Sequence, residues 1–147
     1  VGLRTVFRQF DDMDALYLAI SARTEHEVAP ILAQPFTAPD WRGRMREMLA
    51  RRAKVFEHVM PLKIAGALRR HQSPVLAEAQ ASFVARERAS VMAVAPPALA
   101  ADAERVEALV MATSFEAWRR LREDQGLEPG AAERVTCRLV DLLLSGS

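Results

Sequence analysis

Several polar side chains interrupt otherwise apolar stretches of this sequence, and they are the residues best placed to contact a small molecule. Arg52 breaks a helical stripe of methionine, leucine and phenylalanine, Gln80 and Glu87 flank a similar stripe, and Thr113 and Ser114 lie in an apolar run. A buried charge needs a partner. Arg52 therefore meets an acidic ligand, forms an internal ion pair or extends its head group to water, and the sequence leaves these alternatives open.

Methionine and aromatic side chains on the same predicted helices supply the rest of a candidate pocket, because such side chains adapt to varied apolar ligands. Plain packing in the core is the alternative for each of them. Helix bundles commonly bind ligands between facing helices, so we expect the pocket within residues 39–125. The predicted ligand-binding residues are Met48, Arg52, Phe56, Gln80, Phe83, Met111, Ser114, Phe115 and Trp118.

No residue arrangement typical of catalysis occurs in the sequence. It has no glycine-rich phosphate loop, no helix with paired zinc-binding histidines and no nucleophile elbow. Glu25, His26 and Glu27 are adjacent, so on a helix they point in different directions, and no further ligand follows four residues on. Cys137 lies in an apolar segment and is expected to be a small buried residue. We therefore predict no enzymatic activity, no cofactor and no metal site.

Composition and charge favour helix and argue against a global attraction to nucleic acid or membrane. Half of the 147 residues are hydrophobic, 6% are aromatic and the net charge is +1. Any binding to nucleic acid must therefore depend on a local patch. The single cysteine precludes an internal disulfide and fits a reducing cytoplasm. No apolar run approaches the roughly 20 residues that a membrane span needs. We predict a cytoplasmic protein with no membrane partner.

Prolines and capping residues divide the sequence into helices, so the predicted fold class is all-α. Asp11 and Asp12 offer an N-cap for a second helix, Ser73 and its proline start the fifth, and Gly126 caps the sixth. The predicted helices run over residues 2–10, from 12 to a kink or end at Pro30, from 40 to near Pro61, over 62–68, 74–94 and 98–125, and onward from Pro129.

The last two predicted helices carry more apolar residues than one buried stripe requires. One face of each packs on its own chain, and a four-helix bundle formed by two copies would bury the other. A larger monomeric core with both helices at its centre is the alternative. The residues predicted at a homodimer interface are Val110, Trp118, Leu121, Val135, Leu139 and Leu142.

The opening segment, VGLRTVFRQFDDMDAL, has a characteristic order of residue types. It resembles the end of the helix-turn-helix in TetR-family transcriptional regulators. There a threonine, an aliphatic residue, an aromatic residue and a phenylalanine precede a leucine on the next helix. The motif covers about a tenth of the chain. The residues that match are Thr5, Val6, Phe7, Phe10 and Leu16.

Two positions depart from the family pattern. Gly2 stands where a capping serine or threonine is usual, and Met13 stands where a lysine often reaches a DNA phosphate. The resemblance implies that residues 1–11 form the C-terminal part of a DNA-binding helix-turn-helix and that residues 12–147 form the ligand-binding and dimerisation domain. Because the first headpiece helices are missing from this sequence, we expect the chain alone not to bind DNA specifically.

The resemblance also assigns the residues that face DNA. Thr5 and Phe7 match positions that usually touch phosphate, whereas arginine suits guanine and glutamine suits adenine. An ordinary amphipathic helix with solvated arginines is the alternative. The residues predicted to contact DNA are Arg4, Thr5, Phe7, Arg8 and Gln9.

The resemblance implies a ligand-responsive transcriptional regulator, expected to be a repressor. It would bind a double-stranded DNA operator as a homodimer and leave it when a small-molecule effector binds. A helical dimeric module that binds a ligand or a protein and has no role at DNA is the alternative.

Overall fold

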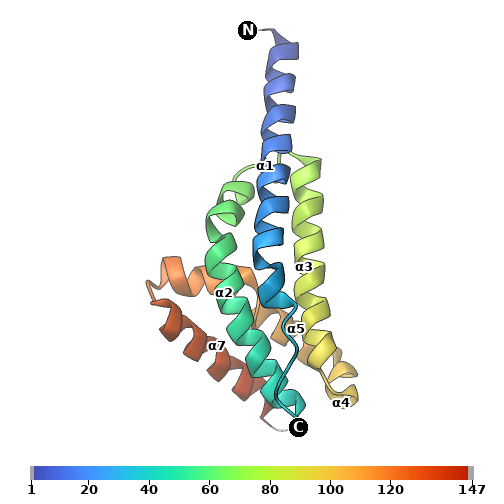
Figure 1. The fold of residues 1–147 in the computed structure, drawn as a ribbon, viewed down its shortest axis with the longest axis vertical. Coiled ribbons are helices and arrows are strands. Elements are labelled where there is room, and N and C mark those ends of the chain that lie inside the picture. The colour runs from blue at the N-terminus through green and yellow to red at the C-terminus, as the bar shows by residue number, and fades with distance from the viewer. Residues whose placement is uncertain (1, 146–147) are drawn as a thin grey trace.

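The structure, a computed structural model, describes residues 2–145 and contains helices and loops in that range (Figure 1). Residues 1, 146 and 147, which belong to the predicted domain ranges, lie outside the described residues. No strand occurs within residues 2–145, so the prediction of an all-α chain is confirmed. The elements are α1 (Leu3–Leu32), α2 (Trp41–Ala67), α3 (Pro74–Val94), α4 (Pro97–Ala100), α5 (Ala103–Ala112), α6 (Phe115–Arg119), the π-helix η1 (Arg120–Asp124) and α7 (Pro129–Leu144).

Local capping signals place several helix ends where the sequence predicts them. The Asp40 carboxylate accepts the Gly43 N–H at 2.8 Å and begins α2. The Ser73 hydroxyl accepts the Leu76 N–H at 3.2 Å and begins α3. Gly126, with a φ of 66°, turns the chain after η1 in a conformation that other residues adopt at a cost.

Two expected helix breaks are wrong, because helix α1 passes through Asp11 and Asp12 and helix α2 continues past Pro61. The end expected at Pro30 lies close to the observed one, since α1 ends at Leu32. Beyond Pro61, helix α2 packs closely on α1, since a Cβ at Gly66 would lie 2.5 Å from the Tyr17 hydroxyl oxygen. Tertiary packing thus outweighs the local preference of proline to end a helix.

The predicted sixth helix is divided into four elements. The main break follows α5, where the Ser114 hydroxyl accepts the Ala117 N–H at 3.1 Å and caps α6. Val106 of α5 and Trp118 of α6 therefore belong to different helices, and both are buried within the chain. The sequence analysis assigned the surplus apolar residues of this segment to an interface with a second copy. Trp118, one of these residues, is instead buried inside the single chain.

Helix α2 lies at the centre and packs against α1, α3, α6 and α7 (Figure 1). Its N-terminal half shares a core with α3, α4, α5 and α7, and its middle shares a second core with α1, α6 and the start of α7. The first core includes Met45, Met48, Leu49, Val91, Leu109 and Val140, and the second includes Val28, Val55, Phe56, Val59, Phe115 and Trp118.

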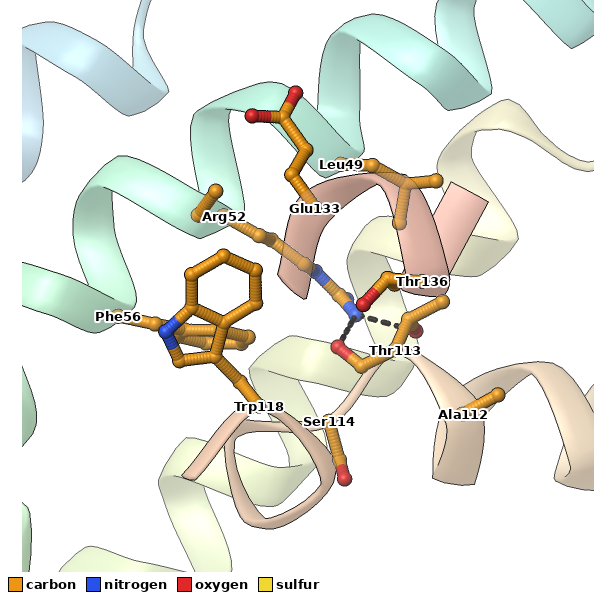
Figure 2. Close-up of a pocket in the computed structure, with 10 residues that line it drawn as sticks. Leu49, Arg52, Phe56, Ala112, Thr113, Ser114, Trp118, Glu133 and Thr136 are labelled. Carbon is orange, nitrogen blue, oxygen red and sulfur yellow. Dashed lines mark hydrogen bonds between the residues drawn. The ribbon is translucent and has the colours of Figure 1, made fainter. Parts of the chain in front are cut away.

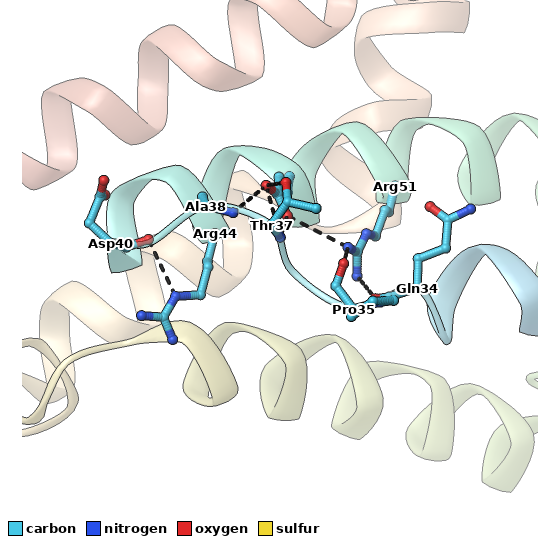
Figure 3. A network of polar contacts seen from close by, with 8 residues as sticks. Gln34, Pro35, Thr37, Ala38, Asp40, Arg44 and Arg51 are labelled. Carbon is cyan, nitrogen blue, oxygen red and sulfur yellow. Dashed lines mark hydrogen bonds and ion pairs between the residues drawn. The ribbon is translucent and has the colours of Figure 1, made fainter.

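The connection between α1 and α2 is fixed to α2 by side chains of α2 itself (Figure 3). Arg51 donates to the carbonyl oxygens of Gln34 and Pro35 at 2.5 and 2.7 Å. The Glu47 carboxylate accepts the N–H groups of Thr37 and Ala38, the latter at 2.8 Å. Hydrogen bonds to the backbone thus hold the loop after α1 against α2.

The N-terminal part of α1 projects beyond the other helices (Figure 1). Asp14 marks the level at which it meets them. Its carboxylate accepts the Ser73 hydroxyl at 2.6 Å and lies 3.0 Å from the Arg69 guanidinium. Among the described residues, no helix is both long enough and apolar enough to cross a bilayer.

Candidate functional site

A groove of about 730 Å³ opens between α1 and α3, with α2 as its floor. Small-molecule sites typically have about 300–1,000 Å³, so the groove is large enough for a small organic ligand. Val28, Val55 and Val59 are buried at its base. Its walls are formed by Tyr17, Leu18, Ser21, Ala22, Thr24, Glu25, Ala29 and Leu32 of α1 and by Ala79, Ser82, Phe83 and Arg86 of α3.

Lys63 of α2 is the cation that lines this groove from its floor. Its ammonium group donates to the Gln80 side-chain oxygen and lies 3.8 Å from the centre of the Phe83 ring. Burial is the main cause that lowers the pKa of Lys63, to about 8, against the opposing effect of Glu87 and Glu116. The side chain is thus a partly desolvated cation held in a defined place by an amide and an aromatic face.

An ion pair joins the two walls of the groove. Arg86 of α3 lies 3.1 Å from Glu25 of α1, and both side chains are exposed. Exposed pairs contribute little to stability, about 0–1 kcal/mol, so this contact can open at small cost. The groove therefore has its floor on α2, and a weak ion pair joins its two walls.

Arg52 is buried and bound by its own chain (Figure 2). Its guanidinium donates to the Thr113 carbonyl and hydroxyl oxygens at 2.7 and 2.6 Å. It also donates to the Glu87 carbonyl and the Ser90 hydroxyl. Desolvation lowers the pKa of Arg52 to about 10, against the opposing effect of Glu87. The space beside this cluster is only about 10 Å³, so Arg52 binds no small molecule in this arrangement.

The Arg52 cluster explains why the chain breaks between α5 and α6. A helix end leaves carbonyl and N–H groups without partners inside the helix. Arg52 satisfies the Thr113 carbonyl on one side of the break, and the Glu87 carboxylate accepts the Phe115 N–H at 2.6 Å on the other. Burial is the main cause that raises the pKa of Glu87, against this hydrogen bond and the nearby Arg52. Arg52 is thus bound inside the chain, but by carbonyl and hydroxyl oxygens and not by the carboxylate of an ion pair.

Of the nine predicted ligand residues, the structure brings four together at the small cavity beside the Arg52 cluster, namely Arg52, Phe56, Ser114 and Trp118. Phe83 lines the groove and Gln80 binds Lys63 beside it. Met48 lies in the first core and Ser114 caps α6, whereas Met111 is 69% exposed. Phe56, Phe115 and Trp118 also form an aromatic cluster with Phe83.

The groove also differs in position from the predicted pocket, because α1 lies outside residues 39–125 and supplies one wall. Sequence reasoning missed Lys63 because it ended the helix near Pro61. The available signal was the spacing of Val55, Val59 and Lys63, which keeps Lys63 on the same helical face as the valines. A cation that continues an apolar stripe is a candidate ligand contact.

The residues predicted to face DNA are all exposed on the projecting part of α1. With about 100° per residue, Arg4, Arg8, Thr5 and Gln9 share a polar face about 140° wide. Phe7 falls about 60° outside it, next to an exposed apolar stripe. That stripe includes Leu3, Val6, Phe10 and Met13.

The predicted dimer residues fall into two groups. Trp118 is buried, and Val110 and Leu121 are partly buried, within the single chain. Val135, Leu139 and Leu142 of α7 are instead 38%, 42% and 56% exposed. Their spacing of four and three residues places them on one face of α7. This α7 stripe, Val135, Leu139 and Leu142, is the part of the predicted interface that remains open.

Comparisons with known proteins identified no relative of this chain. A scan against family models, a search of curated proteins and a search of solved structures each gave no match. The resemblance of the opening segment to TetR-family regulators, the division at residue 12 and the assigned residue roles therefore stay predictions.

Proposed function

We propose that this protein is a ligand-responsive transcriptional regulator that binds operator DNA as a homodimer. The observation that supports this most is the continuity of α1. A single helix carries the predicted DNA-facing residues at one end and forms a wall of the groove at the other. In this proposal a ligand in the groove acts on the projecting end through α1, which moves as one rigid element.

Asp14 is the proposed pivot of this lever. It joins α1 to Ser73, which caps α3, and to Arg69, which follows α2. With a rise of about 1.5 Å per residue, Arg4 lies about 15 Å on one side of the pivot and Val28 about 21 Å on the other. Widening the groove by about 1 Å at Val28 would then move Arg4 by about 0.7 Å in the opposite direction. A homodimer adds such displacements from both copies.

The α7 stripe supports the homodimer in this proposal. A stripe of three exposed apolar residues on an amphipathic helix is suited to a two-fold contact with the same helix of a second copy. Two recognition helices in such a dimer must lie about 34–36 Å apart to enter successive major grooves of DNA. Ligand binding would alter that spacing and so shift the population of DNA-competent dimers.

The apolar stripe on the projecting part of α1 fits the same proposal, since the rest of a helix-turn-helix headpiece would pack there. It also favours the second candidate, a helical ligand- or protein-binding module without a DNA role. In that case the stripe would bind another protein, because exposed apolar patches commonly mark such sites.

Fluorescence anisotropy of the full-length protein separates the two candidates. The probe is labelled DNA flanking its own gene, with scrambled DNA as the control, at several salt concentrations. The regulator requires tight, sequence-dependent binding by a dimer, with affinity falling as salt rises. Binding that is weak and equal for both DNAs would favour the module.

A further inference from the structure

We propose that the groove binds an aliphatic carboxylate of about ten carbon atoms, with its head group at Lys63 and its tail along Val59 and Val55. This inference deepens the proposed function, because it names the class of effector for the same site. It depends on three features of the groove: a cation without a direct carboxylate partner, an apolar row that continues from it, and the length of that row.

The first feature is the lack of a carboxylate partner for Lys63. Among residues 2–145, no carboxylate lies within ion-pair distance of its ammonium group. The two carboxylates that act on it electrostatically are engaged elsewhere. Glu87 accepts the Phe115 N–H at 2.6 Å, and Glu116 lies 3.2 Å from Arg119. An ammonium group has three donors, of which one is used on Gln80, so an anion can still be bound.

The second feature is the surface next to the cation. Val59 and Val55 follow Lys63 at intervals of four residues on the same face of α2, and Val28 of α1 lies beside them in the groove. The three valines form the base and are themselves buried, and the apolar surface still open to water beside them belongs to Leu18 and Leu32 of α1. A ligand that places methylene groups here removes apolar surface from water, which is favourable in proportion to area.

The third feature is length. Eight residues separate Lys63 from Val55, which corresponds to about 12 Å along α2. Each bond of an extended chain advances about 1.2 Å, so a chain of about ten carbon atoms matches the run of α2 from Lys63 to Val55. A small dicarboxylate lacks the apolar tail, and an alkyl ammonium ion would be repelled by Lys63.

Isothermal titration calorimetry of the full chain with sodium decanoate, below its micelle concentration, tests the inference. Decanol is the neutral ligand of matched length. We expect decanoate to bind at least about tenfold more tightly than decanol, as a charge-assisted hydrogen bond implies. Equal affinities for the two ligands, or no decanoate binding, would overturn the proposal.

Variants of the chain's two lysines give the matched comparison. Lys63→Gln should weaken decanoate binding about tenfold and leave decanol unaffected, whereas Lys54→Gln, at an exposed position, should change neither. An unchanged decanoate affinity in Lys63→Gln would contradict the site. Decanoate that binds but leaves DNA affinity unaltered would confirm the ligand class and refute the regulator. Specific DNA binding without decanoate binding would support the regulator and refute the ligand class.

Discussion

Replacement of Arg52 by methionine tests the assignment of this residue to the interior. Methionine keeps the apolar stem and removes the guanidinium, which donates four hydrogen bonds in the structure. The Glu87 carbonyl still receives the Ser90 hydroxyl at 3.1 Å, but the Thr113 carbonyl loses its donor. One buried carbonyl without a partner costs about 1–3 kcal/mol, and Glu87 also loses its neighbouring positive charge. We expect a total of about 3 kcal/mol, because hydrogen bonds from a charged donor are lost in the interior.

In a domain of this size, that loss lowers the melting temperature by about 6–12 °C. Urea and thermal unfolding of the wild type and Arg52→Met measure it. Arg46→Met is the matched control on the same helix, since Arg46 is 67% exposed and lies 3.3 Å from Asp141. Its loss should stay below about 1 kcal/mol. If the two variants lost equal stability, Arg52 would not hold the break between α5 and α6.

Three further predictions concern the groove, the pivot and the dimer. Because burial lowers the pKa of Lys63 to about 8 from its ordinary value of 10.5, the unfolded chain holds that proton more tightly. Wild-type stability should therefore rise relative to Lys63→Met between about pH 8 and 10, and urea midpoints that keep a constant difference would contradict this. Asp14→Asn should cost about 1.5–3 kcal/mol by weakening the contacts to Ser73 and Arg69, and it should reduce the effect of ligand on DNA affinity. An unaltered ligand response would refute the pivot. Leu139→Glu should convert a dimer to monomer in sedimentation, whereas Val84→Glu, an exposed apolar residue of α3, should not.

The helix starts were predictable from the sequence because their signals are local. Asp40 and Ser73 each bond to a backbone N–H three residues ahead, so the residue type and its neighbours suffice. The tight turn at Gly126 is predictable for the same reason, since glycine adopts a positive φ without strain.

The helix breaks were not predictable, because they depend on residues distant in the sequence. Pro61 is tolerated where the following turn packs against Tyr17, and the break after Thr113 is stabilised by Arg52 and Glu87. The sequence did mark these three polar residues as inward-facing, but it contained no information that they meet one another.

The groove was predictable in character and not in position. Apolar residues with a few polar groups were expected, and Phe83 and Gln80 lie at the observed groove. Its second wall is α1, which lies outside residues 39–125, where the pocket was expected. Lys63 was missed because the predicted helix ended at Pro61, so Lys63 was not placed on the same helical face as Val55 and Val59.

The most direct test of the account is DNA binding by the full-length protein carrying Arg4→Ala and Arg8→Ala together. The control is Arg23→Ala, an exposed arginine on the same helix. Anisotropy with DNA flanking the gene should show that the double variant loses sequence-dependent binding and remains a dimer, whereas the control binds as the wild type does. If the double variant and the control bound this DNA equally, the projecting end of α1 would not read DNA and the regulator proposal would be wrong.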